Sequence, residues 1–366
     1  MKITISQSTF SKQLELVGKI ATKHATLAVL QCVLLETKEN SLIIRATNLE
    51  IMTEITIPDV VVETSGIVAV PASILMQTLQ YNKSEKITLS VLDSGVLEVS
   101  TKNTTTTINT IPHEEFPIPN KPEGESVILS GSQFALGIKT AAIAASQSSI
   151  KPELGSVYVY QNKEHSLTFV ATDSFRLMEK TVAQKGVILD TALLIPHKNA
   201  LELARFCDVI ESDPTLVITE NQCSLSFKEG VYITSRLVNG TFPDYKAIIP
   251  KEFSVYSTVV KQDMVSALKK TNIFLNKFRQ VRLKIDNTDI SISSKNNEVG
   301  MISDKILAQT EGETLELSFN QQYLQDPLQY ILDDSLYLQF AGIGRPMVMT
   351  GVNDKNLRYL VMPMNK

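Results

Sequence analysis

The chain has 366 residues, of which 43% are hydrophobic and 20% are charged, and its formal net charge is −4. This composition is that of an ordinary globular protein, and the length predicts two or three domains. No run of about 18 apolar residues occurs, which excludes a transmembrane helix, and the excess of acid is not typical of a nucleic-acid binder. The three cysteines Cys32, Cys207 and Cys223 are widely spaced within apolar patterns. We therefore expect core thiols in a reduced, cytoplasmic protein, with neither disulfides nor a zinc site.

The first third of the chain reads as a strand, a helix and several strands. The residues before Ser6 alternate like a strand and contain no signal-peptide core. Apolar residues recur with helical spacing from Phe10 to about residue 22, and 29–35 is typical of a buried strand. A strand pair is predicted over 42–57, a helix from Pro71 to about residue 81, and a hairpin across Gly95. The β-branched run 104–108 suits an exposed edge strand, and the proline-rich stretch 112–122 predicts a domain boundary.

The rest of the chain follows a similar order. Helices are predicted over 133–146 and 196–207, with strands over 156–161 and 167–182 between them, and 239–245 reads as a turn and linker. The last third has helical patterns at 262–268 and 323–331. It ends in an apolar strand in which Leu360, Met362 and Met364 share one face.

Matching stretches recur at an offset of about 125 residues. Ala46 matches Ala171, and the residues around them share one alternating pattern. A third copy is weaker but present, since Phe319 lies 124 residues past Ile195. Repeats of this length are whole domains, so we predict three domains over residues 1–124, 125–250 and 251–366. The other matched pairs are Phe10 with Phe134, Pro71 with Pro196, and Phe116 with Phe242.

Charge is distributed unevenly between the predicted helices and the rest of the chain. Nine basic residues and four acidic ones lie in or beside the six predicted helices, although the whole chain is acidic. This bias indicates one basic surface built from helices, while scattered solvated lysines remain the alternative. The basic residues are Lys12, Lys19, Lys23, Lys139, Lys198, Arg205, Lys269, Lys270 and Lys277, and the acidic residues are Glu15, Glu202, Asp263 and Asp326.

Four short motifs occur in a fixed order along the chain: ATDSFRL at 171–177, FPDY at 242–245, KFRQVRL at 277–283 and VMPM at 361–364. Together with three equal copies they resemble the bacterial sliding-clamp family, the β subunits of DNA polymerase III. The resemblance spans the whole chain. It implies an α+β fold of three clamp domains, each with two helices packed on antiparallel sheets, and a head-to-tail dimeric ring.

The function implied by this resemblance is that of a processivity factor. The homodimer would encircle double-stranded DNA and slide on it, because contacts with phosphate carry no sequence information. It would hold the replicative polymerase, the clamp loader and repair proteins at high effective concentration near the primer.

The resemblance also implies a cleft for partner peptides between the second and third copies. Methionines and a few polar groups in an apolar pocket suit such a ligand, while an ordinary core strand is the alternative for 362–364. Phe175 departs from the family, where a histidine or another polar residue is frequent. The implied cleft residues are Leu154, Thr172, Ser174, Phe175, Arg176, Leu177, Pro243, Ile248, Asn320, Tyr323, Val361, Met362, Pro363 and Met364.

DNA contacts and the dimer interface are carried over from the family in the same way. The dimer would join copy one, through Thr106 and Ile108 on an edge strand, to Ile273 and Phe274 of copy three. Each DNA-contact residue has a solvated surface residue as its alternative. The implied DNA contacts are Lys23, His24, Gln147, Ser148, Lys151, Lys198 and Arg205.

Motifs for catalysis or cofactor binding are missing from the sequence. Ser174 has no histidine near it in sequence, the four histidines lack metal-ligand spacing, and Gly342 and Gly344 lack the third glycine of a dinucleotide fingerprint. We therefore expect no enzyme activity, no cofactor and no metal. A monomeric peptide-binding scaffold remains the other reading, and it differs from a clamp in lacking a dimer.

Overall fold

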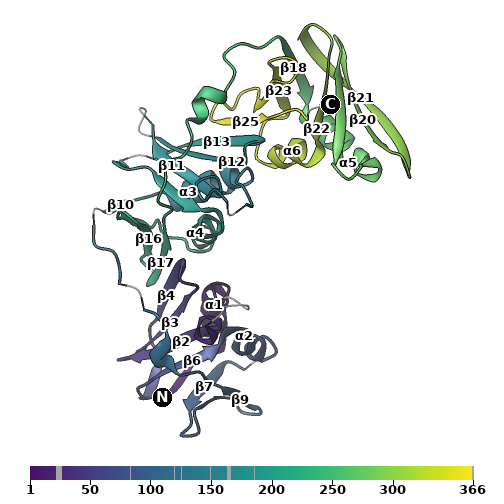
Figure 1. The fold of residues 1–366 in the computed structure, drawn as a ribbon. Coiled ribbons are helices and arrows are strands. Elements are labelled where there is room, and N and C mark those ends of the chain that lie inside the picture. The colour runs from purple at the N-terminus through teal and green to yellow at the C-terminus, as the bar shows by residue number, and fades with distance from the viewer. Residues whose placement is uncertain are drawn as a thin grey trace. The chain divides into compact units, whose positions relative to one another are not determined.

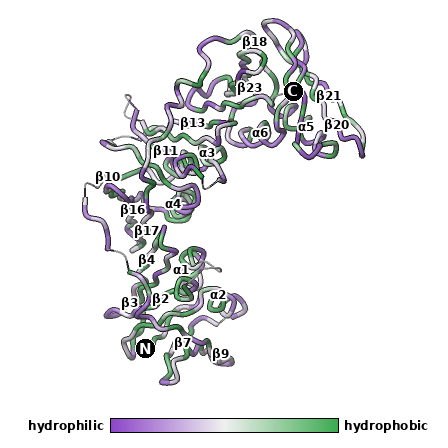
Figure 2. Tube along the Cα trace, in the orientation of Figure 1, coloured by the Kyte–Doolittle hydropathy of each residue, from purple (hydrophilic) through white to green (hydrophobic). Residues whose placement is uncertain are grey.

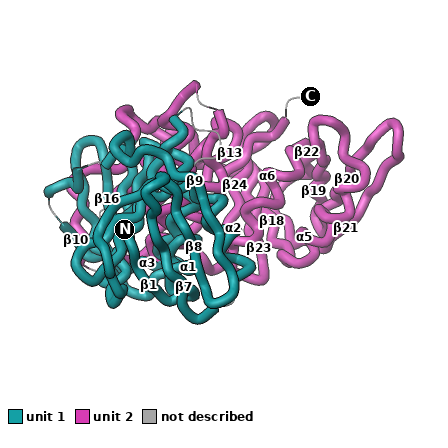
Figure 3. The backbone as a smooth tube through the Cα atoms, turned by 90° about the horizontal axis from the view of Figure 1, so that it is seen from below, with its two compact units in different colours: residues 1–132, 205–237 teal, residues 133–204, 238–366 magenta. Residues whose placement is uncertain are grey.

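The computed structural model describes residues 1–21, 27–82, 84–118, 120–124, 126–148, 150–162, 166–184 and 186–364. These form two compact units, residues 1–132 with 205–237 and residues 133–204 with 238–366 (Figure 3). Hydrophobic stretches are spread over many helices and strands (Figure 2), and no helix of the described residues is long and apolar enough to cross a membrane.

The first unit holds two antiparallel sheets and the helices α1 (Gln7–Gly18) and α2 (Ala72–Gln80), which lie side by side (Figure 1). Helix α1 buries Phe10, Leu14 and Val17. The smaller sheet has the order β5 (Val61–Thr64), β1 (Lys2–Ser6), β7 (Lys86–Val91), β8 (Val96–Ser100), β9 (Thr105–Asn109). The larger has the order β10 (Ser126–Ile128), β15 (Thr215–Ile218), β16 (Gln222–Phe227), β17 (Val231–Arg236), β4 (Ile51–Ile57), β3 (Ser41–Thr47), β2 (Cys32–Lys38), β6 (Ile67–Pro71).

The second unit is built on one twelve-stranded antiparallel sheet. Helices α5 (Lys261–Thr271) and α6 (Gln321–Gln325) belong to it, whereas α3 (Gly131–Ala142) and α4 (His197–Val209) each cross the sequence boundary between the units. The strand order is β14 (Leu193–Pro196), β11 (Ser156–Gln161), β12 (Ser166–Thr172), β13 (Arg176–Ala183), β25 (Leu357–Val361), β24 (Met347–Gly351), β23 (Ser335–Phe340), β18 (Val255–Val260), β21 (Gly300–Gly312), β20 (Asp289–Asn296), β19 (Gln280–Ile285), β22 (Leu315–Asn320).

Several predicted elements are confirmed, and others are wrong in detail. The helices predicted to about residue 22 and to residue 146 end at Gly18 and Ala142. The stretch predicted as a strand from residue 29 begins as a 3-10 helix, Ala28–Gln31, and the strand starts only at Cys32. The last predicted helix stops at Gln325 and continues as a 3-10 helix, η5 (Asp326–Gln329), because Pro327 cannot donate a helical hydrogen bond. The three cysteines are free and buried as predicted, and burial raises the pKa of the Cys32 thiol to about 11.

The turn between β3 and β4 is held by its own side chains. Thr47 Oγ1 donates to the carbonyl oxygen of Ile51 at 3.0 Å and accepts from the backbone N–H of Leu49 at 3.1 Å. Asn48 Oδ1 accepts from the backbone N–H of Ile51 at 2.9 Å. Within this turn Leu49 adopts the left-handed region, with a φ of 76°.

The turn between β12 and β13 repeats these bonds 125 residues later. Thr172 Oγ1 donates to the carbonyl oxygen of Arg176 at 2.7 Å and accepts from the backbone N–H of Ser174 at 3.2 Å. Asp173 Oδ1 accepts from the backbone N–H of Arg176 at 3.0 Å, and Ser174 has a φ of 76°. The shared bonds confirm that the first two repeats fold alike at this point.

Replacing Ser174 with glycine should stabilise the protein. A side chain in the left-handed region costs roughly 1–2 kcal/mol, part of which the greater freedom of glycine in the unfolded chain offsets. We expect Ser174→Gly to raise the free energy of unfolding by about 0.5–1 kcal/mol in urea titrations. The control is Ser94→Gly, in a turn where the serine φ is not positive. An equal gain in both variants would contradict the strain at Ser174.

His197 at the start of α4 should make stability depend on pH. Burial and the positive charge of the neighbouring Lys198 both lower the pKa of its imidazole. A hydrogen bond with the backbone of Ala142 acts in the opposite direction, but the pKa still lies below the usual 6.5. The unfolded chain therefore takes up the proton first, and stability falls as the pH drops through about 6.5 towards the folded-state pKa. The first repeat has an alanine, Ala72, at the position that matches His197. We therefore expect the His197→Ala variant to fold. Its melting temperature should fall less between pH 7.5 and pH 5 than that of the wild type, and an identical fall would contradict this role.

Candidate functional site

The end of the chain joins two distant parts of the second unit. β25 lies beside β13 (Figure 1), and in this pairing Val361 lies opposite Arg176. Beyond β25, the backbone N–H of Met362 donates to the carbonyl oxygen of Phe175 at 2.8 Å, and that of Met364 donates to the carbonyl oxygen of Ser318 at 2.7 Å. The segment 362–364 therefore runs from the β12–β13 turn to β22, which leads into α6. This brings together three of the stretches predicted for the cleft, 172–177, 320–323 and 361–364.

Arg176 is the buried cation at this junction. Its Nε donates to Asp173 Oδ2 at 3.0 Å and its Nη1 to Asp326 Oδ2 at 2.6 Å, while the guanidinium lies 4.3 Å from the ring centroid of Tyr323. Burial would lower the pKa of Arg176, but Tyr359 and the two carboxylates raise it, so the side chain stays charged. With its side chain only 12% exposed, Arg176 ties the β12–β13 turn to η5 more than it offers a free cation to a ligand.

The exposed apolar side chains at the junction come from the turn and the chain end. Phe175 is 61% exposed at the tip of the β12–β13 turn, and Met362 and Met364 are half-buried. Leu177 and Val361 are fully buried and support this surface from beneath. The other predicted lining residues that are buried or nearly so are Leu154, Thr172 and Pro363.

The linker after β17 is anchored on the second unit by Tyr245. Its hydroxyl donates to Glu179 Oε2 at 2.5 Å and lies 2.8 Å from the hydroxyl of Tyr160. Burial, and then the bond to Glu179, raise the pKa of Tyr245, so the phenol remains a donor. Its backbone N–H donates to the carbonyl oxygen of Pro243 at 2.7 Å, and Ile248 lies exposed at the end of the same 3-10 helix, Tyr245–Ile248. Tyr245 thus anchors the part of the linker that carries the predicted cleft residues Pro243 and Ile248.

The residues predicted for the dimer interface differ in exposure. Ile273 is 68% exposed in the 3-10 helix Asn272–Phe274, and Phe274 and Thr106 are half-buried. Ile108 is buried in the core of its own sheet, so only its backbone is available at the β9 edge. Tyr81, which the sequence did not single out, is strongly exposed and lines the same cavity as Thr106 of β9. In the sequence it is an aromatic residue directly after the end of α2.

Four of the predicted DNA contacts are exposed, namely Gln147, Ser148, Lys151 and Lys198. Lys23 and His24 lie outside the described residues. Arg205 has a partner within the protein, since its Nη2 donates to the carbonyl oxygen of Leu16 in the last turn of α1 at 2.9 Å. This bond satisfies a helix-end carbonyl.

The helical charge bias is smaller than the sequence count. Asp208, which belongs to α4, was left out of that count, while Lys277 lies beyond the helices and Lys23 outside the described residues. Within the bounds of the six α-helices of the described residues, seven basic residues stand against four acidic ones. They are Lys12, Lys139, Lys198, Arg205, Lys261, Lys269 and Lys270 against Glu15, Glu202, Asp208 and Asp263.

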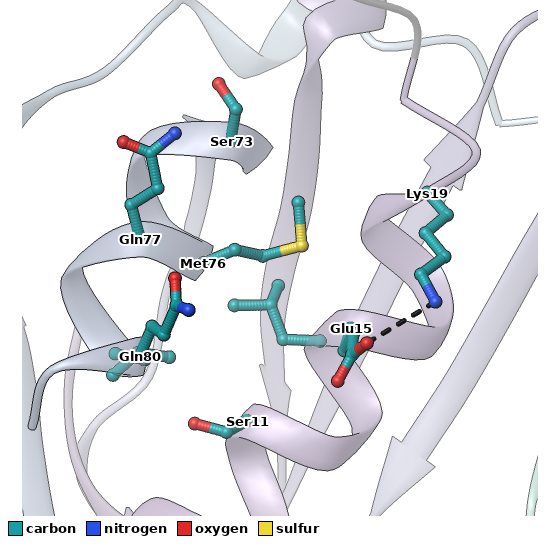
Figure 4. Close-up of a pocket in the computed structure, with 9 residues that line it drawn as sticks. Ser11, Glu15, Lys19, Ser73, Met76, Gln77 and Gln80 are labelled. Atoms are coloured by element: carbon teal, nitrogen blue, oxygen red, sulfur yellow. Dashed lines mark ion pairs between the residues drawn. The ribbon is translucent and has the colours of Figure 1, made fainter.

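A pocket that the sequence did not predict lies between α1 and α2 (Figure 4). It has a volume of about 410 Å³, and small neutral polar side chains such as Ser11 and Gln77 face it. Its charged groups are Glu15 and Lys19, whose side chains pair at 3.3 Å. Among the described residues, no three histidine, cysteine or acidic side chains are grouped as metal ligands would be.

Comparison with known proteins decides the family. Three family models match the chain in succession: the N-terminal domain of the DNA polymerase III beta subunit over residues 1–120, its central domain over 128–244 and its C-terminal domain over 246–365. The chain belongs to the DNA polymerase III beta subunit family. These matches confirm the resemblance to the sliding-clamp family that the sequence motifs indicated. They also confirm the fold of three clamp domains with helices on antiparallel sheets. Membership gives the chain the role of a sliding clamp, a processivity factor of DNA replication.

Individual beta subunits are similar over the whole chain. The beta sliding clamp of Staphylococcus aureus is 24% identical over 376 residues, covering 100% of this chain and 99% of the relative. The sliding clamp of Bacillus subtilis shares the fold with a TM-score of 0.92 at 23% identity, covering 100% of this chain and 99% of the other. The clamp of Bartonella birtlesii, solved bound to griselimycin, has a TM-score of 0.93 at 26% identity and full coverage of both chains.

Proposed function

We propose that two copies of this chain form a closed head-to-tail ring that encircles duplex DNA, and that the cleft at 172–177 and 361–364 tethers the polymerase, the clamp loader and repair proteins. The observation that supports a ring most strongly is that successive repeats are joined by strand pairing. β4 of the first repeat pairs with β17 of the second, and β13 of the second pairs with β25 of the third. Each junction between repeats is thus one antiparallel strand pair.

Two of the free strand edges lie at the two ends of the series and suit the same rule. β9 is the last strand of its sheet, and the first half of β21, residues 300–306, pairs with β20 alone because β18 pairs only with residues 308–312. Pairing β21 of one subunit with β9 of the other would repeat the junction, and two such pairings close a ring. A cavity of about 510 Å³ lined by Tyr81 and Thr106 lies beside β9, and the exposed Ile273 on the third repeat is a residue that could fill it.

The helices would face the DNA in such a ring. Lysines on α1, α4 and α5 can neutralise phosphates, and these contacts carry no sequence information, so the ring can slide. Helix α2 carries no charged side chain, so it neither attracts nor repels phosphates.

Replacing Glu15 should strengthen direct binding to DNA. Glu15 pairs with Lys19 on α1, so Glu15→Gln removes a charge that repels phosphate and frees the lysine. One exposed charge is worth about 1 kcal/mol or less, so we expect the affinity for a short duplex at 50 mM salt to rise about two- to fivefold by fluorescence anisotropy. Glu220→Gln, on an exposed loop before β16, is the charge-matched control. An equal gain in both variants would show a general effect of net charge.

The cleft suits a short peptide with an apolar anchor. Phe175, Ile248 and the two half-buried methionines offer an adaptable apolar surface, while Arg176 and Tyr245 hold the two sides of the cleft in place. Griselimycin is the ligand named for the clamps of Bartonella birtlesii and Pseudomonas aeruginosa, and it is a candidate probe for this surface.

The oligomeric state tests the proposal against a monomeric peptide-binding scaffold. Light scattering at micromolar concentration should give twice the chain mass of 40.5 kDa. Negative-stain images should show a closed ring of six lobes. A monomer, or a dimer without a central opening, would contradict the ring and favour the scaffold.

A further inference from the structure

We propose that the partner cleft continues past Met364 into a groove that binds an acidic segment flanking the apolar anchor of a partner peptide. This inference rests on the proposed function of the cleft. The groove has a volume of about 510 Å³ and lies between β19, β22 and the loop 341–346 that joins β23 to β24.

Two residues connect the groove to the cleft. Pro363 and Met364 line the groove, and both belong to the segment 361–364 that is predicted to line the cleft. The hydrogen bond from Met364 to Ser318 places this segment directly beside β22, which forms one wall of the groove. A peptide anchored at Phe175 and Met362 can therefore extend across Met364 without leaving the surface.

The groove has two further apolar lining residues besides Pro363 and Met364. Ile343 is 80% exposed at the tip of the loop, whereas Leu317 is buried at the floor. Ile343 and Met364 line the same groove, so a ligand that occupies it would bury apolar surface of both side chains. The stem of a flanking peptide residue would pack across Ile343.

The charge of the groove favours an acidic ligand. Arg282 and Glu316 are its charged lining residues, and their side chains pair at 3.2 Å while both stay about half exposed. An exposed pair of this kind is worth about 1 kcal/mol or less, so a carboxylate of the peptide can compete with Glu316 for Arg282. Arg345, which follows the lining residue Gly344, is exposed, so the loop 341–346 carries a second positive charge.

Fluorescence anisotropy with matched peptides tests this inference. The probe is an apolar heptapeptide selected by phage display on the wild-type dimer, used alone, with three aspartates added at either end, or with three serines added. We expect the aspartates at one end to raise affinity about three- to tenfold over the serines, and the gain to disappear in 0.5 M salt. Arg282→Ala should remove this gain and leave the plain heptapeptide unchanged, and Ile343→Ser should weaken only the extended peptides.

Two control variants match these changes. Lys284→Ala removes an exposed cation from the same face of β19 that pairs with Asp286 and does not line the groove. Leu332→Ser removes a similarly exposed aliphatic side chain elsewhere in the same unit. Equal effects of Arg282→Ala and Lys284→Ala, or no gain from either aspartate extension, would overturn the groove while leaving the cleft intact. A plain heptapeptide that still binds after residues 362–366 are removed would instead overturn the cleft, and the groove with it.

Discussion

Removal of residues 362–366 is expected to weaken the binding of partner peptides at least about 100-fold while leaving the dimer intact. The truncation removes Met362 and Met364 from the proposed cleft, and covering these two half-buried side chains with a peptide would be worth about 3 kcal/mol. β25 ends at Val361 and keeps its pairing with β13 and β24, so the fold should persist. Anisotropy with a labelled peptide selected on the wild-type dimer measures the loss.

A point variant guards this result against unfolding. Met364→Asp should cause most of the same loss, whereas Leu332→Asp, at an exposed position outside the predicted cleft residues, should cause none. Melting temperatures and light scattering show whether each variant remains a folded dimer. An unchanged peptide affinity in a folded truncated protein would rule out the cleft at this junction.

Replacing Ile273 with arginine is expected to convert the dimer into monomers. In the proposed interface, burial of the Ile273 side chain would contribute about 1.5–3 kcal/mol, and a charged group in the same apolar contact would cost more. The dissociation constant should therefore rise at least about 100-fold, as measured by sedimentation over a dilution series.

A second isoleucine provides the matched control for the dimer. Ile188 is 69% exposed, close to the 68% of Ile273, and lies between β13 and β14, outside the predicted interface. Ile188→Arg should remain a dimer with the same dissociation constant as the wild type. A dimer that survives Ile273→Arg would place the interface elsewhere.

The repeats and two of the segments that meet at the chain end could be predicted because their information is local. The turn bonds of Thr47 and Thr172 depend on residues two and four positions away, so an offset of 125 in the sequence reappears as the same turn in the structure. The motif around Phe175 and the apolar chain end at 361–364 likewise marked two of the segments that meet.

Features that depend on distant residues could not be read in this way. Asp326, the second partner of Arg176, lies 150 residues away, and Leu16 lies 189 residues from Arg205. Ile108 fitted an exposed edge strand by its neighbours, but packing turned its side chain into the core. Alternation along a strand gives two faces and does not say which of them the rest of the fold will cover.

Retention on DNA with and without free ends tests the ring most directly. The wild-type protein is loaded with its clamp loader and ATP onto a nicked circular plasmid and separated by gel filtration in moderate salt. Half of the sample is then cut once with a restriction enzyme. A closed ring predicts that the protein elutes with the intact circle and is lost from the linear DNA, whereas equal retention on both would contradict a ring that holds DNA by encircling it.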